Sequence, residues 1–215
     1  MAAEIELGPD ETVAGRPFAD PEHTRRDEEA LRHLLGHERQ RARLWADDWS
    51  RGETDVILRE TDPEGLRHLL VVPDTRALLE TRHPTVVGFF GRPKSDADEP
   101  LLFELEEELV AGMGAYAADG LLSYYDVELV KGAYGNLILF ATPDGPRRWR
   151  ENPVHRRAVE VSPGNYYEIR LHQGTLAGRL LDGGALHVTR TRYLDYREPE
   201  VWRAVRPMPP TASEG

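Results

Sequence analysis

The sequence contains no cysteine among its 215 residues. A disulfide framework and a metal site built from thiolates are therefore excluded, and we expect a protein of the reducing cytoplasm. No apolar run approaches the roughly 18–20 residues that a membrane-spanning helix needs. The first residues also lack the basic start and apolar run of a secretory signal, so we predict no signal peptide and no membrane partner.

Basic residues are in the minority, because 27 lysines and arginines stand against 38 aspartates and glutamates, for a net charge of −11. A field of this sign repels a phosphate backbone, so we expect no nucleic-acid partner. The C-terminal half nevertheless has a local basic bias, made by Arg147, Arg148, Arg150, Arg156, Arg157, Arg170, Arg190 and Arg192. These arginines either form solvated helix faces or bind a small anionic ligand.

Several catalytic motifs are also missing. The glycines at Gly112 and Gly132 do not form a loop between a strand and a helix that is followed by Lys and Ser or Thr, so no phosphate-binding loop is present. No Gly-x-Ser-x-Gly elbow occurs, and the few serines have no adjacent base. Hydrolase, kinase and dinucleotide-enzyme functions therefore have little support.

The chain divides into four segments by composition and hydrophobic periodicity. Residues 1–20 are rich in Glu, Asp, Gly and Pro and are predicted to form a disordered tail. Residues 21–83 are predicted to form a helical and extended N-terminal arm, whose helix carries an apolar stripe that includes Leu31, Leu34 and Leu35. Residues 84–200 form the main domain, and residues 201–215 form a loose tail rich in proline.

The main domain has the pattern of alternating strands and helices expected for an α+β fold. We predict strands at 86–90, 121–130, 136–140 and 166–172, a helix at 102–116, and a second helix that opens at Thr142 and Pro143. Pro153 cannot donate to the preceding turn, so this helix should break there and restart with Asn152 as its cap. The order βαββαβ is that of the ferredoxin-like unit, with a four- to five-stranded antiparallel sheet if residues 186–196 add a fifth strand.

The predicted strands are apolar or aromatic on both faces, whereas both helices would cover one face only. The other face therefore needs a cover. A second copy of the chain supplies one, so we predict a homodimer in which the strand at 186–196 pairs with the edge of its neighbour.

The broken helix carries the first candidate site, made of Trp149, Asn152 and His155. If the helix restarts at Asn152, His155 lies in its first turn, where the helix dipole disfavours the imidazolium form. A neutral imidazole can accept a substrate proton or bind a haem iron. The alternative is a half-buried histidine that packs on the sheet.

The strands carry two further candidate groups, which are Tyr124, Asp126 and Asn136, and Tyr166, Arg170 and His172. Whether the members of the first group share a face depends on the register of the strands. Members of the second group share a face of their strand by the period of two residues, where they would bind a carboxylate, a quinone-like oxygen or a haem propionate. The alternative for the second group is a solvated edge or a dimer contact.

A last candidate is the pair His33 and His37, spaced as two zinc ligands on one helix face. The zinc-protease motif needs Glu directly after the first His, and Leu34 stands there. We therefore predict no metal site. A minor alternative is a metal-dependent activity that uses His33 and His37, with Glu29 as a third ligand.

The element order, together with the helix that carries Trp149 and His155, resembles the dimeric α+β-barrel superfamily over about half of the chain. Its members include antibiotic-biosynthesis monooxygenases, haem-degrading monooxygenases, chlorite dismutases and aldoxime dehydratases. The resemblance implies a homodimeric, monooxygenase-like or haem-dependent oxidoreductase acting on a small planar ligand or haem. It carries over Trp149 and His155. Together with the strand residues above, the candidate catalytic residues are His155, Trp149, Asn136 and Tyr124, and the candidate cofactor-binding residues are His155, Arg170, Tyr166 and His172. The alternative is a non-catalytic ligand-binding or assembly dimer whose N-terminal helix recruits a partner.

Overall fold

The computed structural model describes residues 4–129 and 134–208. Its strands are β1 Ile5–Glu6, β2 Thr54–Thr61, β3 Arg67–Asp74, β4 Thr85–Pro93, β5 Leu121–Glu128, β6 Tyr134–Phe140, β7 Tyr166–Leu176, β8 Leu186–Asp195 and β9 Trp202–Pro207. Its α-helices are α1 Pro21–Leu44, α2 Ala46–Trp49, α3 Thr75–Glu80, α4 Glu99–Gly112, α5 Gly145–Glu151 and α6 Pro153–Asn165. Short 3-10 helices lie at η1 Pro17–Ala19, η2 Met113–Ala117 and η3 Leu180–Asp182.

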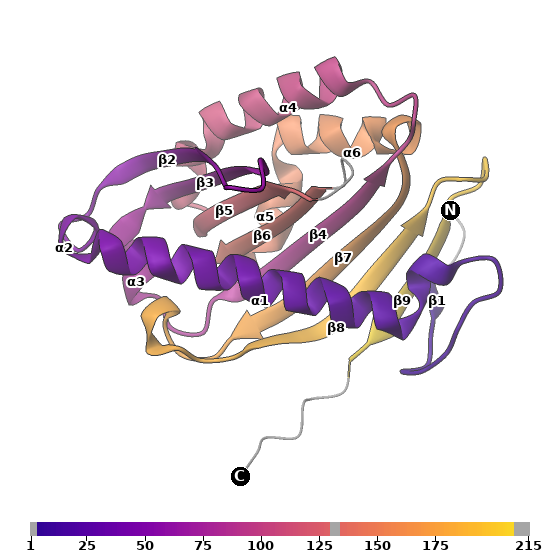
Figure 1. Ribbon diagram of the computed structural model, residues 1–215, viewed down its shortest axis with the longest axis horizontal. Coiled ribbons are helices and arrows are strands. Elements are labelled where there is room, and N and C mark those ends of the chain that lie inside the picture. The colour runs from indigo at the N-terminus through magenta and orange to yellow at the C-terminus, as the bar shows by residue number, and fades with distance from the viewer. Residues whose placement is uncertain (1–3, 130–133, 209–215) are drawn as a thin grey trace, which may run out of the picture.

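All of these strands belong to one nine-stranded sheet, in the order β1-β9-β8-β7-β4-β6-β5-β3-β2 (Figure 1). Neighbouring strands are antiparallel except β1 and β9, which are parallel, so the sheet is mixed. The predicted four- to five-stranded antiparallel sheet of ferredoxin-like type was therefore wrong, and so was the resemblance to a dimeric α+β barrel. The strand at 186–196 also pairs within its own chain, with β7 and β9, and not with a neighbour.

The sheet is wider because it includes segments that the sequence placed outside the main domain. The expected arm at residues 21–83 contributes β2 and β3, which extend the sheet beyond β5. The expected disordered tail and the expected loose C-terminal tail contribute β1 and β9 at the opposite edge. Residues 1–3 and 209–215 of those tails, and residues 130–133 of the predicted turn, lie outside the described residues.

Helix α1 covers one face of the sheet (Figure 1). Its buried Leu31, Leu34 and Leu35 join a core cluster with side chains of β3, β4, β5 and β6. The approach is close, because a Cβ on Gly88 of β4 would lie 2.8 Å from Cδ1 of Leu31. The chain itself thus supplies the cover that we expected from a second copy. Homodimer formation stays a prediction, but its argument from an uncovered face no longer applies.

The opposite face packs against α4, η2 and α5. Its strands present alternate side chains there, among them Leu69, Tyr124, Ile138 and Phe140, which cluster with Val110, Met113 and Trp149 of the helical layer. Helix α6 lies beside α4, to which Arg157 is joined by an ion pair with Glu108 of 2.9 Å. None of the helices within the described ranges combines the length and the apolar character needed to cross a bilayer.

The N-terminal segment is held on the sheet by a fully buried guanidinium. Arg206 of β9 is 0% exposed and donates to the backbone carbonyls of Gly8, Pro9, Glu11 and Ala19. Buried charges persist only where hydrogen bonds replace the lost water. Residues 4–20, which the composition predicted to be part of a disordered tail, therefore have a defined path.

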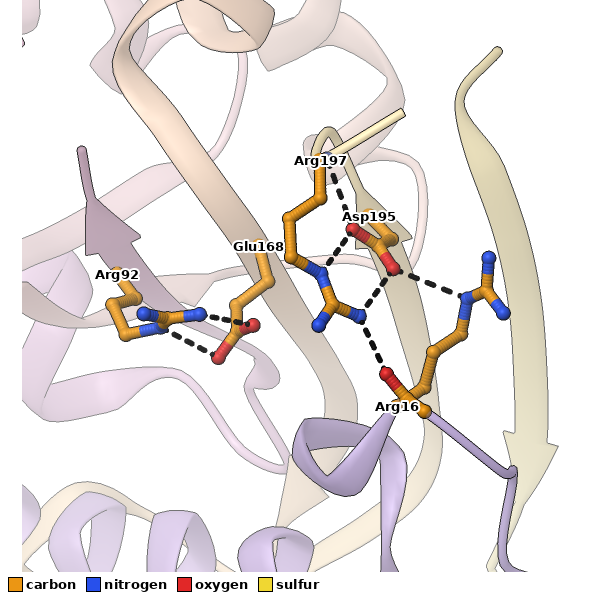
Figure 2. A network of polar contacts seen from close by, with 6 residues as sticks. Arg16, Arg92, Glu168, Asp195 and Arg197 are labelled. Carbon is orange, nitrogen blue, oxygen red and sulfur yellow. Dashed lines mark hydrogen bonds and ion pairs between the residues drawn. The ribbon is translucent and has the colours of Figure 1, made fainter. Parts of the chain in front are cut away.

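Ion pairs add to this anchorage. Glu168 of β7 and Asp195 of β8 are direct cross-strand neighbours, an arrangement that repels when both are charged and unpaired. Arg92 holds Glu168 by two hydrogen bonds of 2.9 Å, and Arg16 and Arg197 hold Asp195 at 3.1 and 2.6 Å, as Figure 2 shows. Since Arg16 precedes η1, the compensation of Asp195 also fixes the N-terminal segment.

We expect Arg206→Lys to free this segment, because one ammonium group cannot satisfy carbonyl acceptors spread around a planar guanidinium. The free energy of unfolding should fall by roughly 3 kcal/mol, and a glutamate-specific endoprotease should cleave after Glu11, whose carbonyl Arg206 binds, under native conditions. Arg203→Lys on the same strand is the matched control and should change neither result. Unaltered resistance to this protease in the Arg206 variant would contradict the anchoring role.

Helix α1 also carries an acidic side chain, that of Glu38, on its buried side. Glu38 is 0% exposed, and neither of its carboxylate oxygens has a hydrogen-bond partner among the described residues. Burial raises the pKa of Glu38 from 4.5 to about 7, opposed in part by the nearby hydroxyl of Ser123 and then by Arg39. The folded protein therefore retains a proton that the unfolded chain releases above pH 4.5.

This difference predicts that stability falls as pH rises from about 4.5 to 7, by roughly 3 kcal/mol for this group. Glu38→Gln removes the titrating group, so its free energy of unfolding should lack this component of the pH dependence. Urea denaturation of both proteins at several pH values measures the difference. Glu29→Gln, at an exposed position of the same helix, should retain the wild-type slope. An identical slope in the Glu38 variant would overturn the assignment.

Candidate functional site

The main cavity lies between the sheet and the layer of α4, α5 and α6. It has a volume of about 1590 Å³ and is partly open to solvent. Pockets for drug-sized ligands usually occupy about 300–1,000 Å³, so this one accommodates a larger molecule or one with room to move. Its roof includes Leu102, Leu105 and Leu109 of α4, Trp149 of α5 and His155 of α6.

The floor of the cavity consists of cross-strand neighbours that line up across the sheet. One row is Tyr124, Ile138, Val87, Gln173 and Arg190; the next is Asp126, Asn136, Phe89, Leu171 and Arg192; the third is Glu128, Tyr134, Gly91, Ile169, Leu194 and Arg203. All of these residues except Gly91 line the cavity. Each row begins with a phenol or an acid on β5, becomes apolar in the middle and ends with an arginine on β8 or β9.

The break between α5 and α6 places His155. The carbonyl oxygen of the Asn152 side chain accepts from the backbone N–H of Val154 at 2.7 Å and of His155 at 3.2 Å. The predicted restart with Asn152 as cap is confirmed. The cap holds His155 in the first turn, where its ring centroid lies 5.6 Å from that of Trp149.

Trp149 connects the histidine to the floor of the cavity. Its ring centroid also lies 6.5 Å from that of Tyr124 and 5.4 Å from that of Tyr116. Three of the candidate catalytic residues, Tyr124, Trp149 and His155, therefore form one continuous aromatic wall. Periodicity along the chain does not determine the distance between the broken helix and β5, and the structure brings them together.

The environment of His155 keeps its ring neutral. Burial, and then the positive charge of Arg150, lowers the pKa of His155 to about 4. Its Nδ1 is buried without a hydrogen-bond partner, and the described residues provide no partner for the other ring nitrogen. An unsatisfied polar group of this kind in a folded protein indicates a ligand or water that completes it.

A polar cluster lies on the floor beside the aromatic wall. Asn136 donates from Nδ2 to the hydroxyl oxygen of Tyr124 at 2.8 Å and to a carboxyl oxygen of Asp126. Tyr124, Asp126 and Asn136 therefore share a face of the sheet. The sequence had left this open, because it depended on the register of the strands. Because the Tyr124 oxygen accepts from Asn136, its own O–H is available to donate into the cavity.

The acid of this cluster is protonated more readily than an ordinary aspartic acid. Burial, followed by the nearby negative charge of Glu106, raises the pKa of Asp126 well above its usual value. Burial likewise raises the pKa of Glu106 and of Tyr124. Glu106 lies on α4 and was missed, because in the sequence it is one member of an acidic helix face; only its inward position distinguishes it.

The predicted row of Tyr166, Arg170 and His172 is not formed. Tyr166 borders the cavity, whereas Arg170 and His172 lie on the other face of the sheet and bind Asp27 of α1 at 2.5 and 2.9 Å. The period of two fails because the pairing of β4 with β7 shifts between Arg92 and Pro93, next to Tyr166. The two basic residues therefore fasten α1 and do not reach the candidate site.

His33 and His37 lie on α1, across the sheet from the cavity. Their Nε2 atoms are 3.0 Å apart, and the ring of His37 stacks on that of His68 at 5.7 Å. Within residues 4–129 and 134–208, no three His, Cys, Asp or Glu side chains are arranged to hold a metal ion. We therefore build no site on this pair.

Comparison with known proteins assigns no family. No family model matches the chain, and no curated protein matches it. A solved structure described as the crystal structure of PA3566 from Pseudomonas aeruginosa is 17% identical, with 44% of this chain and 94% of that chain covered and a TM-score of 0.38. A likeness this weak supports no conclusion about fold or function.

The cap at Asn152 can be tested by its effect on stability. We expect Asn152→Ala to lower the free energy of unfolding by about 1 kcal/mol, because two backbone N–H groups lose their acceptor. Asp144→Ala is the matched control, since Asp144 precedes α5 without a side-chain cap bond, and it should change stability by less than about 0.5 kcal/mol. Equal effects of the two substitutions would show that the cap does not stabilise the restart.

Proposed function

We propose that this protein binds an apolar organic molecule with a carbonyl or phenolic oxygen and moves a proton on it. The observation that supports this most directly is the neutral, unpartnered imidazole of His155 in the same cavity as the hydroxyl of Tyr124. A base without a bound proton and a protonated donor in one apolar site is the usual arrangement for acid–base chemistry.

Ligand binding follows from the walls of the cavity. Phe89, Ile138, Trp149 and Leu171 provide apolar and aromatic contact, while Tyr124 and His155 provide polar groups that fix an orientation. Transfer of apolar ligand surface from water to such walls is favourable by about 25 cal/mol per Å². The site thus selects molecules that are mostly apolar and carry an oxygen at one end.

The proposed reaction is proton abstraction next to a carbonyl group. His155 takes the proton, the C–H bond breaks, and its electron pair moves onto the carbonyl oxygen to give an enolate. The O–H of Tyr124, whose oxygen is held by Asn136, donates to the developing oxyanion. In a β,γ-unsaturated ketone the charge of this enolate is shared with the γ-carbon. Return of the proton from His155 to the γ-carbon re-forms the carbonyl group and completes an isomerisation without any net change in oxidation state. A positioned base of this kind typically contributes 10²–10⁴-fold to the rate.

Oxidoreductase activity and haem binding rested on the resemblance that the nine-stranded sheet contradicts. Of the residues assigned to the cofactor, Arg170 and His172 lie on the opposite face of the sheet. Both ideas stay untested predictions, and we do not build the proposed function on them.

A non-catalytic binding protein is the second candidate. Asp126 and Asn136 satisfy each other by hydrogen bonding, so the cluster is stable without chemistry. Recruitment of a partner through the N-terminal helix has less support, because Leu31, Leu34 and Leu35 are buried against the sheet. Tight binding of a ketone without proton exchange would favour this candidate.

The test follows hydrogen–deuterium exchange at the α-carbons of β-tetralone, a planar ketone, by NMR in heavy water. We expect the wild-type protein to accelerate exchange and His155→Gln to reduce the rate by about 10²-fold or more. Since the pKa of His155 is about 4, the rate should be flat from pH 5 to pH 8 and should fall only as the pH approaches 4. A base with an unshifted pKa would lose activity near pH 6.5.

The control is His33→Gln, an exposed histidine outside the cavity, which should exchange at the wild-type rate. Circular dichroism checks that both variants are folded. Exchange that is unaffected by the His155 substitution, or that shows a midpoint near pH 6.5, would exclude His155 as the base.

A further inference from the structure

Three arginines form the end of the cavity floor farthest from Tyr124. Arg190 and Arg192 lie two residues apart on β8, so they share a face about 7 Å apart. Arg192 pairs directly with Val205 of β9, and Arg203 lies two residues before Val205. Arg203 is therefore the diagonal neighbour of Arg192, at about 7–8 Å. We call these three residues the arginine row.

The arginine row has more positive charge than the described residues neutralise. Arg190 donates to the neutral amide of Gln173 at 2.6 Å, and no described carboxylate lies within ion-pair distance of Arg203. Of the three, only Arg192 has an acidic partner among the residues that the structure describes. Like charges this close repel unless an anion lies between them, and such a positive surface is unexpected in a protein of net charge −11. It indicates a place where a negative group binds.

The chain itself shows which kind of group the row accepts. Glu4, which also lines the cavity, reaches over from the N-terminal segment, and its carboxylate pairs with Arg192 at 2.6 Å. A carboxylate therefore fits against these guanidinium groups. Arg190 and Arg203, on either side of Arg192, retain donors for a second one.

The register of the sheet fixes how far a ligand must extend. Arg192, Leu171, Phe89 and Asn136 are successive neighbours on β8, β7, β4 and β6. Three strand spacings separate the first from the last, which is about 14 Å. Tyr124 lies on β5, one spacing farther. A molecule that touches both ends is thus elongated, and its middle lies on the apolar side chains of Leu171 and Phe89.

We propose that the natural ligand is an elongated amphipathic carboxylate. Its negative group binds the arginine row, where it competes with the carboxylate of Glu4, its apolar body crosses β7 and β4, and its oxygen-bearing end reaches Tyr124 and Asn136. The proposal rests on the function proposed above and adds the chemical class and the orientation of the substrate. It also explains why the cavity exceeds the size of a small aromatic ring.

The test compares dansylaminoundecanoic acid with its methyl ester, two fluorescent probes that differ only in charge at one end. We expect the acid to bind the wild-type protein about tenfold or more tightly than the ester. Raising the salt concentration from 50 mM to 500 mM should weaken binding of the acid and leave the ester unchanged. The double variant Arg190→Gln and Arg203→Gln should bind both probes with similar affinity.

Two further variants keep the test independent of folding defects. Arg82→Gln, at an exposed position outside the cavity, should behave as wild type. Glu4→Gln removes the competing carboxylate, so it should bind the acid several-fold more tightly than wild type does. A gain in affinity of this kind cannot result from misfolding.

The outcomes separate this inference from the proposed function. Equal affinity of acid and ester, or no effect of the arginine and Glu4 substitutions, overturns the carboxylate ligand while β-tetralone exchange still supports the acid–base site. Failure of both probes to bind, with β-tetralone exchange intact, also overturns it. Loss of β-tetralone exchange in the wild-type protein contradicts the proposed function itself.

Discussion

The close packing of α1 on the sheet is the contact on which the rest of the structure depends. Gly88 lets Leu31 approach the backbone of β4, and Asp27 on the same helix binds Arg170 and His172 of β7. Helix α1 thus closes one face of the sheet. The helices on the other face leave part of that face uncovered. The cavity lies on that second face.

The register of the sheet then decides the chemistry of the cavity floor. Antiparallel pairing brings Asp126, Asn136, Phe89, Leu171 and Arg192 into one line, although they come from five different strands. The line runs from an acid through apolar side chains to a cation. A shift of one residue in any pair would turn alternate side chains to the α1 face and break this gradient.

Burial shifts the pKa of three titratable groups, with opposite consequences for the acids and for the base. In Glu38 and Asp126 it favours the protonated acid, and in His155 it favours the neutral base. Glu38 lies under α1, where it makes stability depend on pH. Asp126 and His155 line the cavity, where a base and a protonated acid in one apolar space are suited to proton transfer.

The sequence by itself determined what depends on neighbours along the chain: the helix from Pro21, the main strands from β4 to β8, and the restart at Asn152. It left open, as a matter of strand register, whether Tyr124, Asp126 and Asn136 share a face. Only the tertiary structure decided that β2, β3 and β9 join the sheet, that α1 covers it, and that Arg170 and His172 turn away from the cavity. Periodicity and capping act over a few residues, whereas strand order, bulges and the choice of face arise from pairing between distant segments.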